Sequence, residues 1–170
     1  MTSREIVSRA IHFKNPPRLP VEMGCFGVAD TGWVGWSRAA GWTPSVPGED
    51  EWGCVWEKTD IQNMGQVKGH PLADISKLAN YRPPDYRDPS RYVDLAAGLD
   101  KVESQGKYVL SGIFMVLFER MHSLHGFEDT LIDLYDNRPA MENMADMITE
   151  THVSLVREVS RRFPGRINGW

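Results

Sequence analysis

The chain has 170 residues and a formal net charge of −4, and 41% of its residues are hydrophobic and 25% charged. These proportions are ordinary for a globular protein, and the length predicts one domain with enough chain to bury a core. The small charge gives no reason to expect a nucleic-acid or membrane partner, and no apolar run reaches the roughly 18 residues of a membrane span. The charged N-terminus is unlike a secretory signal, and Cys25 and Cys54 are too few for a disulfide scaffold, so we expect a cytoplasmic protein.

The beginning of the chain predicts a helix and then a short strand. Apolar residues recur at helical spacing over residues 3–13, with Ser3 as the expected cap, before a Pro-Pro pair ends the pattern. Residues 18–23 form the first predicted strand, and Pro20 limits its pairing on one side. Glu22 therefore lies near the carboxyl end of that strand.

Residues 25–70 predict an insertion rich in glycine and tryptophan. Its first half has no regular period, and we interpret it as a long functional loop or cover. Residues 50–59 place Trp52 and Trp56 on one face, together with the cysteine between them, as a strand does. Residues 64–70 are a second extended segment, so the two predict a hairpin-like flap.

The second half of the chain alternates helices with strands. Its central step is an apolar strand at residues 108–114, followed by Glu119 and Arg120 and then a new helical pattern. The longest predicted helix covers residues 139–163. One stripe of that helix is suited to a core: Met144, Met147, Ile148, Thr151, Leu155 and Val159. Helical turns are also expected at residues 71–81, 88–105, 117–125 and 127–135, and the entry to a strand at residues 166–170.

Alternating strands and helices predict a mainly parallel sheet. A (β/α)8 barrel needs about 250 residues, so this chain would hold two to three of eight units. We therefore expect a truncated protein with open barrel edges, which predicts self-association through those edges.

Several motifs resemble the uroporphyrinogen decarboxylase-like superfamily. They are DEWGCVWE at residues 50–57, HPLAD at residues 70–74, YRPPD at residues 81–85, and Phe118-Glu119-Arg120 followed by LHGFE at residues 124–128. The opening helix and the PRLPV run at residues 17–21 also fit. The resemblance extends over nearly the whole chain, as one partial barrel domain at residues 1–170.

The resemblance implies a TIM barrel, represented here by its N-terminal half, and one of two chemistries. The first is decarboxylation of uroporphyrinogen in tetrapyrrole (haem) biosynthesis, and the second is corrinoid-dependent methyl transfer or O-demethylation, often with a catalytic zinc. Decarboxylases of this family carry an arginine-rich run after the first strand, which pairs with substrate carboxylates. The matching residues 23–27 contain no arginine, and this absence favours methyl transfer.

The family's zinc ligands, a His-x-Cys pair and a later Cys, belong to the second half of the barrel. The resemblance therefore implies no cofactor bound by this portion, and zinc and a corrinoid-protein methyl donor for the complete protein. Two alternatives stay open, namely uroporphyrinogen decarboxylation and a non-catalytic half-barrel that needs a second chain.

The candidate site residues follow from their places at strand ends. Glu119 and Arg120 are candidate catalytic residues, with a structural ion pair as the alternative. Glu22, Trp52 and Trp56 are candidate binding residues for a small-molecule substrate, with a local hydrophobic core as the alternative for the tryptophans.

The histidines and cysteines show no spacing typical of a metal site. His122 and His125 lie three positions apart, which places both on one face of a helix, but no third ligand follows nearby. We therefore expect no zinc bound by these residues.

Overall fold

The computed structural model describes residues 1–58, 60 and 65–170. The chain divides into two compact units. Unit 1 comprises Met1–Ala39, Pro89–Ile113 and Arg157–Trp170, and unit 2 comprises Ala40–Asp88 and Phe114–Val156.

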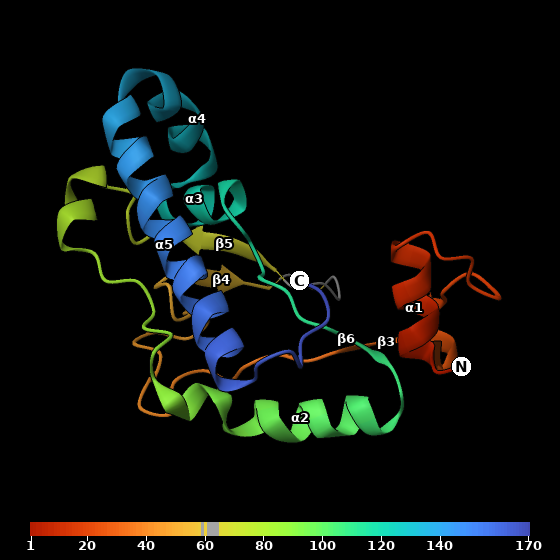
Figure 1. The fold of residues 1–170 in the computed structure, drawn as a ribbon. Helices are drawn as coiled ribbons and strands as arrows, with labels where there is room; N and C mark the ends of the chain where they lie inside the picture. Colours follow the sequence, from red (N-terminus) through yellow and green to blue (C-terminus); the bar gives the residue numbers. More distant parts are fainter. Residues whose placement is uncertain (59, 61–64) are drawn as a thin grey trace. The chain divides into compact units, whose positions relative to one another are not determined.

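Unit 1 is built from helices and short strands drawn from three parts of the chain (Figure 1). Its elements are α1 (Ser3–Ile11), β1 (Glu22–Met23), η1 (Gly24–Phe26), β2 (Val28–Ala29), β3 (Thr31–Trp33), η3 (Pro89–Tyr92), α2 (Val93–Ser104) and β6 (Tyr108–Leu110). The last turns of α5 (Arg138–Arg162) also belong to it.

Helix α1 begins at Ser3 as predicted, but it is capped one residue earlier and ends at Ile11. Thr2, not Ser3, is its cap: the Thr2 side chain accepts a hydrogen bond from the Glu5 backbone N–H, and the Glu5 carboxylate accepts one from the Thr2 N–H. This reciprocal pair is a capping box. Ile6 and Val7 are the buried residues of this helix.

The central strand of unit 1 is β6, which pairs in parallel with β3 in the register Thr31↔Tyr108 to Trp33↔Leu110. The β3 backbone approaches α2 closely at Gly32, because a Cβ atom there would lie 2.5 Å from a methyl group of Val102. On its other side Leu110 forms a parallel bridge with Gly169, as the predicted strand entry at residues 166–170 requires.

The strand predicted at residues 18–23 is wrong in extent and in partner. Only Glu22–Met23 forms a strand, and it pairs antiparallel with β2. A tight local turn through η1 returns the chain onto β1, and β3 occupies the place beside β6.

Unit 2 contains a hairpin and helices. Its elements are β4 (Val55–Glu57), β5 (Gln66–Gly69), η2 (Ile75–Asn80), α3 (Phe118–His125), α4 (Phe127–Asp136) and the larger part of α5. Strands β4 and β5 pair antiparallel, which confirms the predicted hairpin within the described residues, and Thr59 and residues 61–64 of the flap lie outside them.

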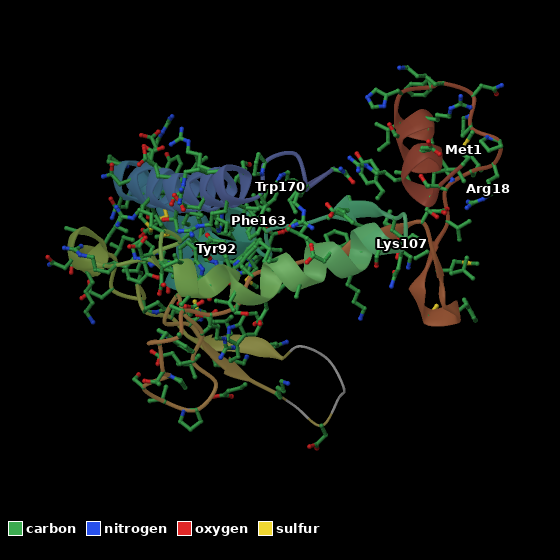
Figure 2. The ribbon with its side chains drawn as sticks, turned by 60° about the horizontal axis from the view of Figure 1, so that its bottom comes forward. Met1, Arg18, Tyr92, Lys107, Phe163 and Trp170 are labelled. Atoms are coloured by element: carbon green, nitrogen blue, oxygen red, sulfur yellow. The ribbon has the colours of Figure 1, made fainter. Side chains whose placement is uncertain are left out.

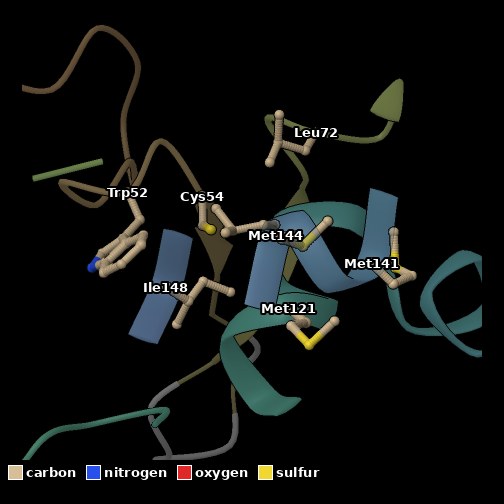
Figure 3. Packing of buried hydrophobic residues seen from close by; sticks show 8 residues of the cluster. Trp52, Cys54, Leu72, Met121, Met141, Met144 and Ile148 are labelled. Carbon is tan, nitrogen blue, oxygen red and sulfur yellow. The ribbon is translucent and has the colours of Figure 1, made fainter. Parts of the chain in front are cut away.

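The core of unit 2 joins the hairpin to α3 and α5 (Figure 3). Its buried residues are Trp52, Cys54, Leu72, Met121, Leu124, Met141, Met144 and Ile148. Two of them belong to the stripe predicted on the longest helix, and Leu155 and Val159 of the same stripe are fully buried too.

The predicted half of a TIM barrel is wrong. Over the described residues the sheets are three pairs of strands, and none of them closes. Only the β3–β6 pair is parallel, since the other strands find antiparallel partners within a few residues in sequence. Strands of two to four residues offer too few ladder hydrogen bonds for a continuous barrel wall.

Among the helices that the structure describes, none combines the length and the apolar character of a membrane span.

Candidate functional site

Asp50 shapes the loop that carries the tryptophans of unit 2. Its Oδ1 atom accepts hydrogen bonds of 2.9 Å from the backbone N–H groups of Trp52 and Cys54. Its Oδ2 atom accepts a third, also 2.9 Å, from the indole N–H of Trp56. A carboxylate that bonds its own loop in this way fixes a turn, and the turn directs Trp52 and Cys54 into the core.

Arg120 lies beside this turn and is almost completely buried, with 4% of its surface exposed. Its Nη1 atom lies 3.5 Å from Asp50 Oδ2, and its guanidinium carbon lies 4.6 Å from the centre of a Trp52 ring. Within the described part of the chain, neither Nε nor Nη1 has a hydrogen-bond acceptor. A buried donor without an acceptor costs about 1–3 kcal/mol, and more for a charged group.

His152 of α5 contacts the same tryptophan. The two rings meet edge to face with their centres 5.4 Å apart. Burial and then the positive charge of Arg120 lower the pKa of His152 below its usual value, so the imidazole is neutral at pH 7. Its Nδ1 atom is also buried and has no partner among the described residues. We call Asp50, Trp52, Arg120 and His152 the Arg120 cluster.

Cys54 and Tyr81 border the cluster and are held neutral. Burial raises the pKa of the Cys54 thiol to about 12, and the thiol donates a hydrogen bond to the Ser123 carbonyl. Burial also raises the pKa of Tyr81, whose hydroxyl donates a 2.7 Å bond to the Trp52 carbonyl. Because only a thiolate is a strong nucleophile or metal ligand, Cys54 acts here as a structural hydrogen-bond donor.

Two histidines tie the segment before η2 to α3. His70 Nδ1 donates to the Ser123 carbonyl at 2.8 Å, and His125 Nδ1 donates to the Leu72 carbonyl at 2.7 Å. His125 Nε2 also lies 3.0 Å from a carboxylate oxygen of Asp133. Both imidazoles are therefore occupied by structural contacts.

The structure separates the two histidines that the sequence places on one helical face. His125 is buried, whereas the His122 ring packs edge to face against Phe118 and Phe127. The described residues contain no group of three or more His, Cys, Asp or Glu side chains arranged to hold a metal ion.

The structure brings some predicted site residues together and leaves others apart. Trp52 and Arg120 are in contact, and Trp56 bonds Asp50 and lies 6.3 Å from the ring of Phe114. Glu119 is exposed, and the carboxylate that neighbours Arg120 is Asp50 instead. Glu22 is exposed on β1, in unit 1.

Sequence reasoning missed Asp50 and His152. Asp50 opens the DEWGCVWE run, and an Asp followed by a Gly-containing turn signals a side chain that bonds its own loop. His152 had no such signal, because the residues that surround it, Trp52 and Arg120, are about 30 to 100 positions away in the sequence.

Comparison of the chain with protein-family models, with curated proteins and with solved structures gives no match.

Proposed function

We propose that this chain belongs to an enzyme of corrinoid-dependent methyl transfer, in which the Arg120 cluster holds the anionic end of a small substrate. One observation carries the proposal. Four motifs behind the family resemblance meet in one partly buried set of contacts. Asp50 accepts hydrogen bonds from Trp52 and Cys54, Tyr81 donates to the Trp52 carbonyl, and Cys54 and His70 both donate to the Ser123 carbonyl. His125 donates to the Leu72 carbonyl, and Arg120 lies 3.5 Å from Asp50 as an ion pair.

Arg120 is suited to bind an anion for three reasons. Its guanidinium keeps its charge at any physiological pH, and Trp52 supports one face of it. The carboxylate oxygens of Asp50 accept hydrogen bonds from Trp52, Cys54 and Trp56. Two Arg120 nitrogens therefore have no acceptor among the described residues. A carboxylate or sulfonate would supply the missing acceptors.

In the proposed reaction, a thiolate acceptor attacks the methyl group of a methylcorrinoid. The new bond is sulfur–carbon, and the carbon–cobalt bond breaks with both electrons remaining on cobalt, so the corrinoid leaves as Co(I). Arg120 binds and orients the acceptor through its guanidinium N–H groups. The resemblance also implies zinc, but the described residues offer no cluster for it, and no step is assigned to a metal ion of the protein.

Uroporphyrinogen decarboxylation has less support. A substrate with many carboxylates needs several arginines, and the cluster contains one. Residues 23–27, where the decarboxylases carry theirs, form an exposed turn around η1 without any arginine.

A matched pair of acceptors tests the proposal. The protein, as its gene encodes it, is mixed anaerobically with methylcobalamin and either 2-mercaptoethanesulfonate or the neutral 2-mercaptoethanol. We expect formation of Co(I) and a methyl thioether, with a lower KM for the sulfonate. Arg120→Lys should raise the KM for the sulfonate roughly tenfold, which corresponds to about 1.4 kcal/mol, and leave the neutral thiol unaffected.

Arg138→Lys is the control, because Arg138 is an exposed arginine of unit 2 that pairs with Glu142. Absence of thioether with either thiol would contradict methyl transfer. Turnover that does not distinguish the two thiols would show that Arg120 is a structural group.

A further inference from the structure

Helix α4 carries a stripe of exposed apolar side chains. It is ten residues long, and Thr130 is its one buried residue. Phe127, Leu131, Leu134 and Tyr135 follow one another at helical spacing and are exposed, Tyr135 to 90%. A stripe of large apolar side chains on a helix surface marks an interaction site.

The charged residues of helix α4 itself all have one sign. Helix α4 carries Glu128, Asp129, Asp133 and Asp136 and no basic residue. His125 pairs with Asp133, and the other three carboxylates are exposed. The face therefore fits a partner that is apolar at its centre and basic at its rim. We call it the α4 stripe.

A surface of that description lies in unit 1. Residues 9–19 carry Arg9, Lys14 and Arg18, and residues 6–21 contain no acidic residue. Arg18 lies on the loop after α1 and pairs with Asp30 (Figure 2). Ile11, Phe13 and Leu19 are exposed on the same segment. We call residues 9–19 the basic segment.

The backbone at Phe13 supports a binding role for the basic segment. Phe13 has a φ of +54° and its side chain is 96% exposed. A bulky residue in the left-handed region is uncommon and costs free energy, and such residues concentrate at binding and functional sites. Phe13 directly follows the C-cap of α1, where the Lys14 N–H donates to the Arg9 carbonyl, and its whole aromatic ring is exposed to solvent.

We propose that the basic segment of one copy of the chain binds the α4 stripe of a second copy. The opposite charges set this pairing, and Phe13 supplies the aromatic anchor typical of interface hot spots. Two α4 stripes would not bind each other, because their carboxylates would repel. Because the contact joins two different surfaces, copies can bind head to tail into a chain. Two copies that bind each other reciprocally would instead form a closed dimer.

Light scattering after size-exclusion chromatography tests this inference, which does not depend on the proposed function. We expect an apparent mass that rises above 19.3 kDa with protein concentration and falls with added salt. Phe13→Ser changes a fully exposed side chain and should shift the midpoint of association at least tenfold upward in concentration. Val93→Ser, at another exposed apolar residue of unit 1, is its control and should not.

Charge exchange identifies the two surfaces. Variant A carries Glu128→Lys and Asp136→Lys, and variant B carries Arg9→Glu and Lys14→Glu. Each alone should be a monomer, and an equimolar mixture should associate again, since the lysines of A face the glutamates of B. A wild-type protein that is monomeric at every concentration would overturn the inference, as would a mixture that stays monomeric although both variants melt cooperatively.

Discussion

Two aspartates with neighbouring arginines illustrate how similar pairs acquire different roles. Asp30 is buried and bonds both terminal nitrogens of Arg18, at 2.5 and 2.7 Å, as well as the Val21 N–H. Asp50 bonds its own loop, and Arg120 lies at 3.5 Å without a hydrogen bond to it. The first pair satisfies its own donors, whereas in the second Arg120 Nε and Nη1 have no acceptor within the described part of the chain.

The Asp30–Arg18 pair makes unit 1 sensitive to acid. Its hydrogen bonds hold the pKa of Asp30 well below the usual range, so its contribution to stability is present above the unfolded-state pKa and is lost as pH falls below it. Asp30→Asn should lower the free energy of unfolding by about 1–3 kcal/mol near pH 7. We expect the lower end of this range, because Arg18 is half exposed.

In urea titrations, the difference in the free energy of unfolding between wild type and Asp30→Asn should become smaller below roughly pH 4. Asp85→Asn is the control, because Asp85 makes a similar two-point contact with Arg87 between exposed side chains and should cost less than about 1 kcal/mol. A difference that is the same at pH 3 and pH 7 would contradict the assignment.

The Arg120 cluster predicts that the pKa of His152 responds to the charge of Arg120. Replacing Arg120 by Met removes the positive charge that lowers the pKa of His152, so that pKa should rise, although burial still keeps it below normal. Because two Arg120 nitrogens lack acceptors, stability should change by less than about 1 kcal/mol.

NMR titration of the His152 ring, with Arg138→Met as the control, measures this effect. An unchanged His152 pKa would mean that the two side chains are not neighbours. A loss of stability of about 3 kcal/mol or more would identify the Arg120–Asp50 contact as a structural tie.

At the scale of elements, α5 is the part of unit 2 on which the buried cluster most depends. Ile148 is fully buried in that cluster. Ile148→Ala should lower the free energy of unfolding by about 2–5 kcal/mol, because it leaves a cavity as well as losing apolar contacts. Val153→Ala on the same helix is the control, since Val153 is 37% exposed and should cost much less. Equal losses in urea titrations would contradict the packing of α5.

The sequence predicts elements well where their signal is local. The stripe of α5 and the pairing of the flap follow from periods of 3.6 and 2 residues, and both are present. The strand predicted at residues 50–59 is wrong in extent: residues 51–53 form a turn that Asp50 bonds, and only Val55–Glu57 is a strand. The prediction of strand pairing is wrong. Strand β6 pairs with β3 and not with residues 18–23, because that pairing depends on residues far apart in sequence. The site shows the same division: Trp52 and Arg120 stand out in the sequence, while His152 joins them only through tertiary packing.

At the scale of the whole molecule, each compact unit has buried residues of its own. Unit 1 buries Leu95, Leu99 and Val109, whereas the Trp52–Ile148 cluster belongs entirely to unit 2. Helix α5 supplies both, and it passes from unit 2 to unit 1 at Arg157. Local stability can therefore differ between the units even within one helix.

We predict that the two units open separately. In hydrogen exchange followed by peptide mass spectrometry, Ile148→Ala should speed exchange in unit 2 peptides, including α3, and leave β3 and β6 unchanged. Asp30→Asn should do the reverse, because its ion pair lies in unit 1. The reason is that exchange from a cooperative unit tracks the free energy of opening that unit, so a substitution affects only the amides that open with it. The double variant should show the sum of both effects. If either single variant speeds exchange equally in both units, the chain opens as one cooperative body and the division into two units carries no energetic meaning.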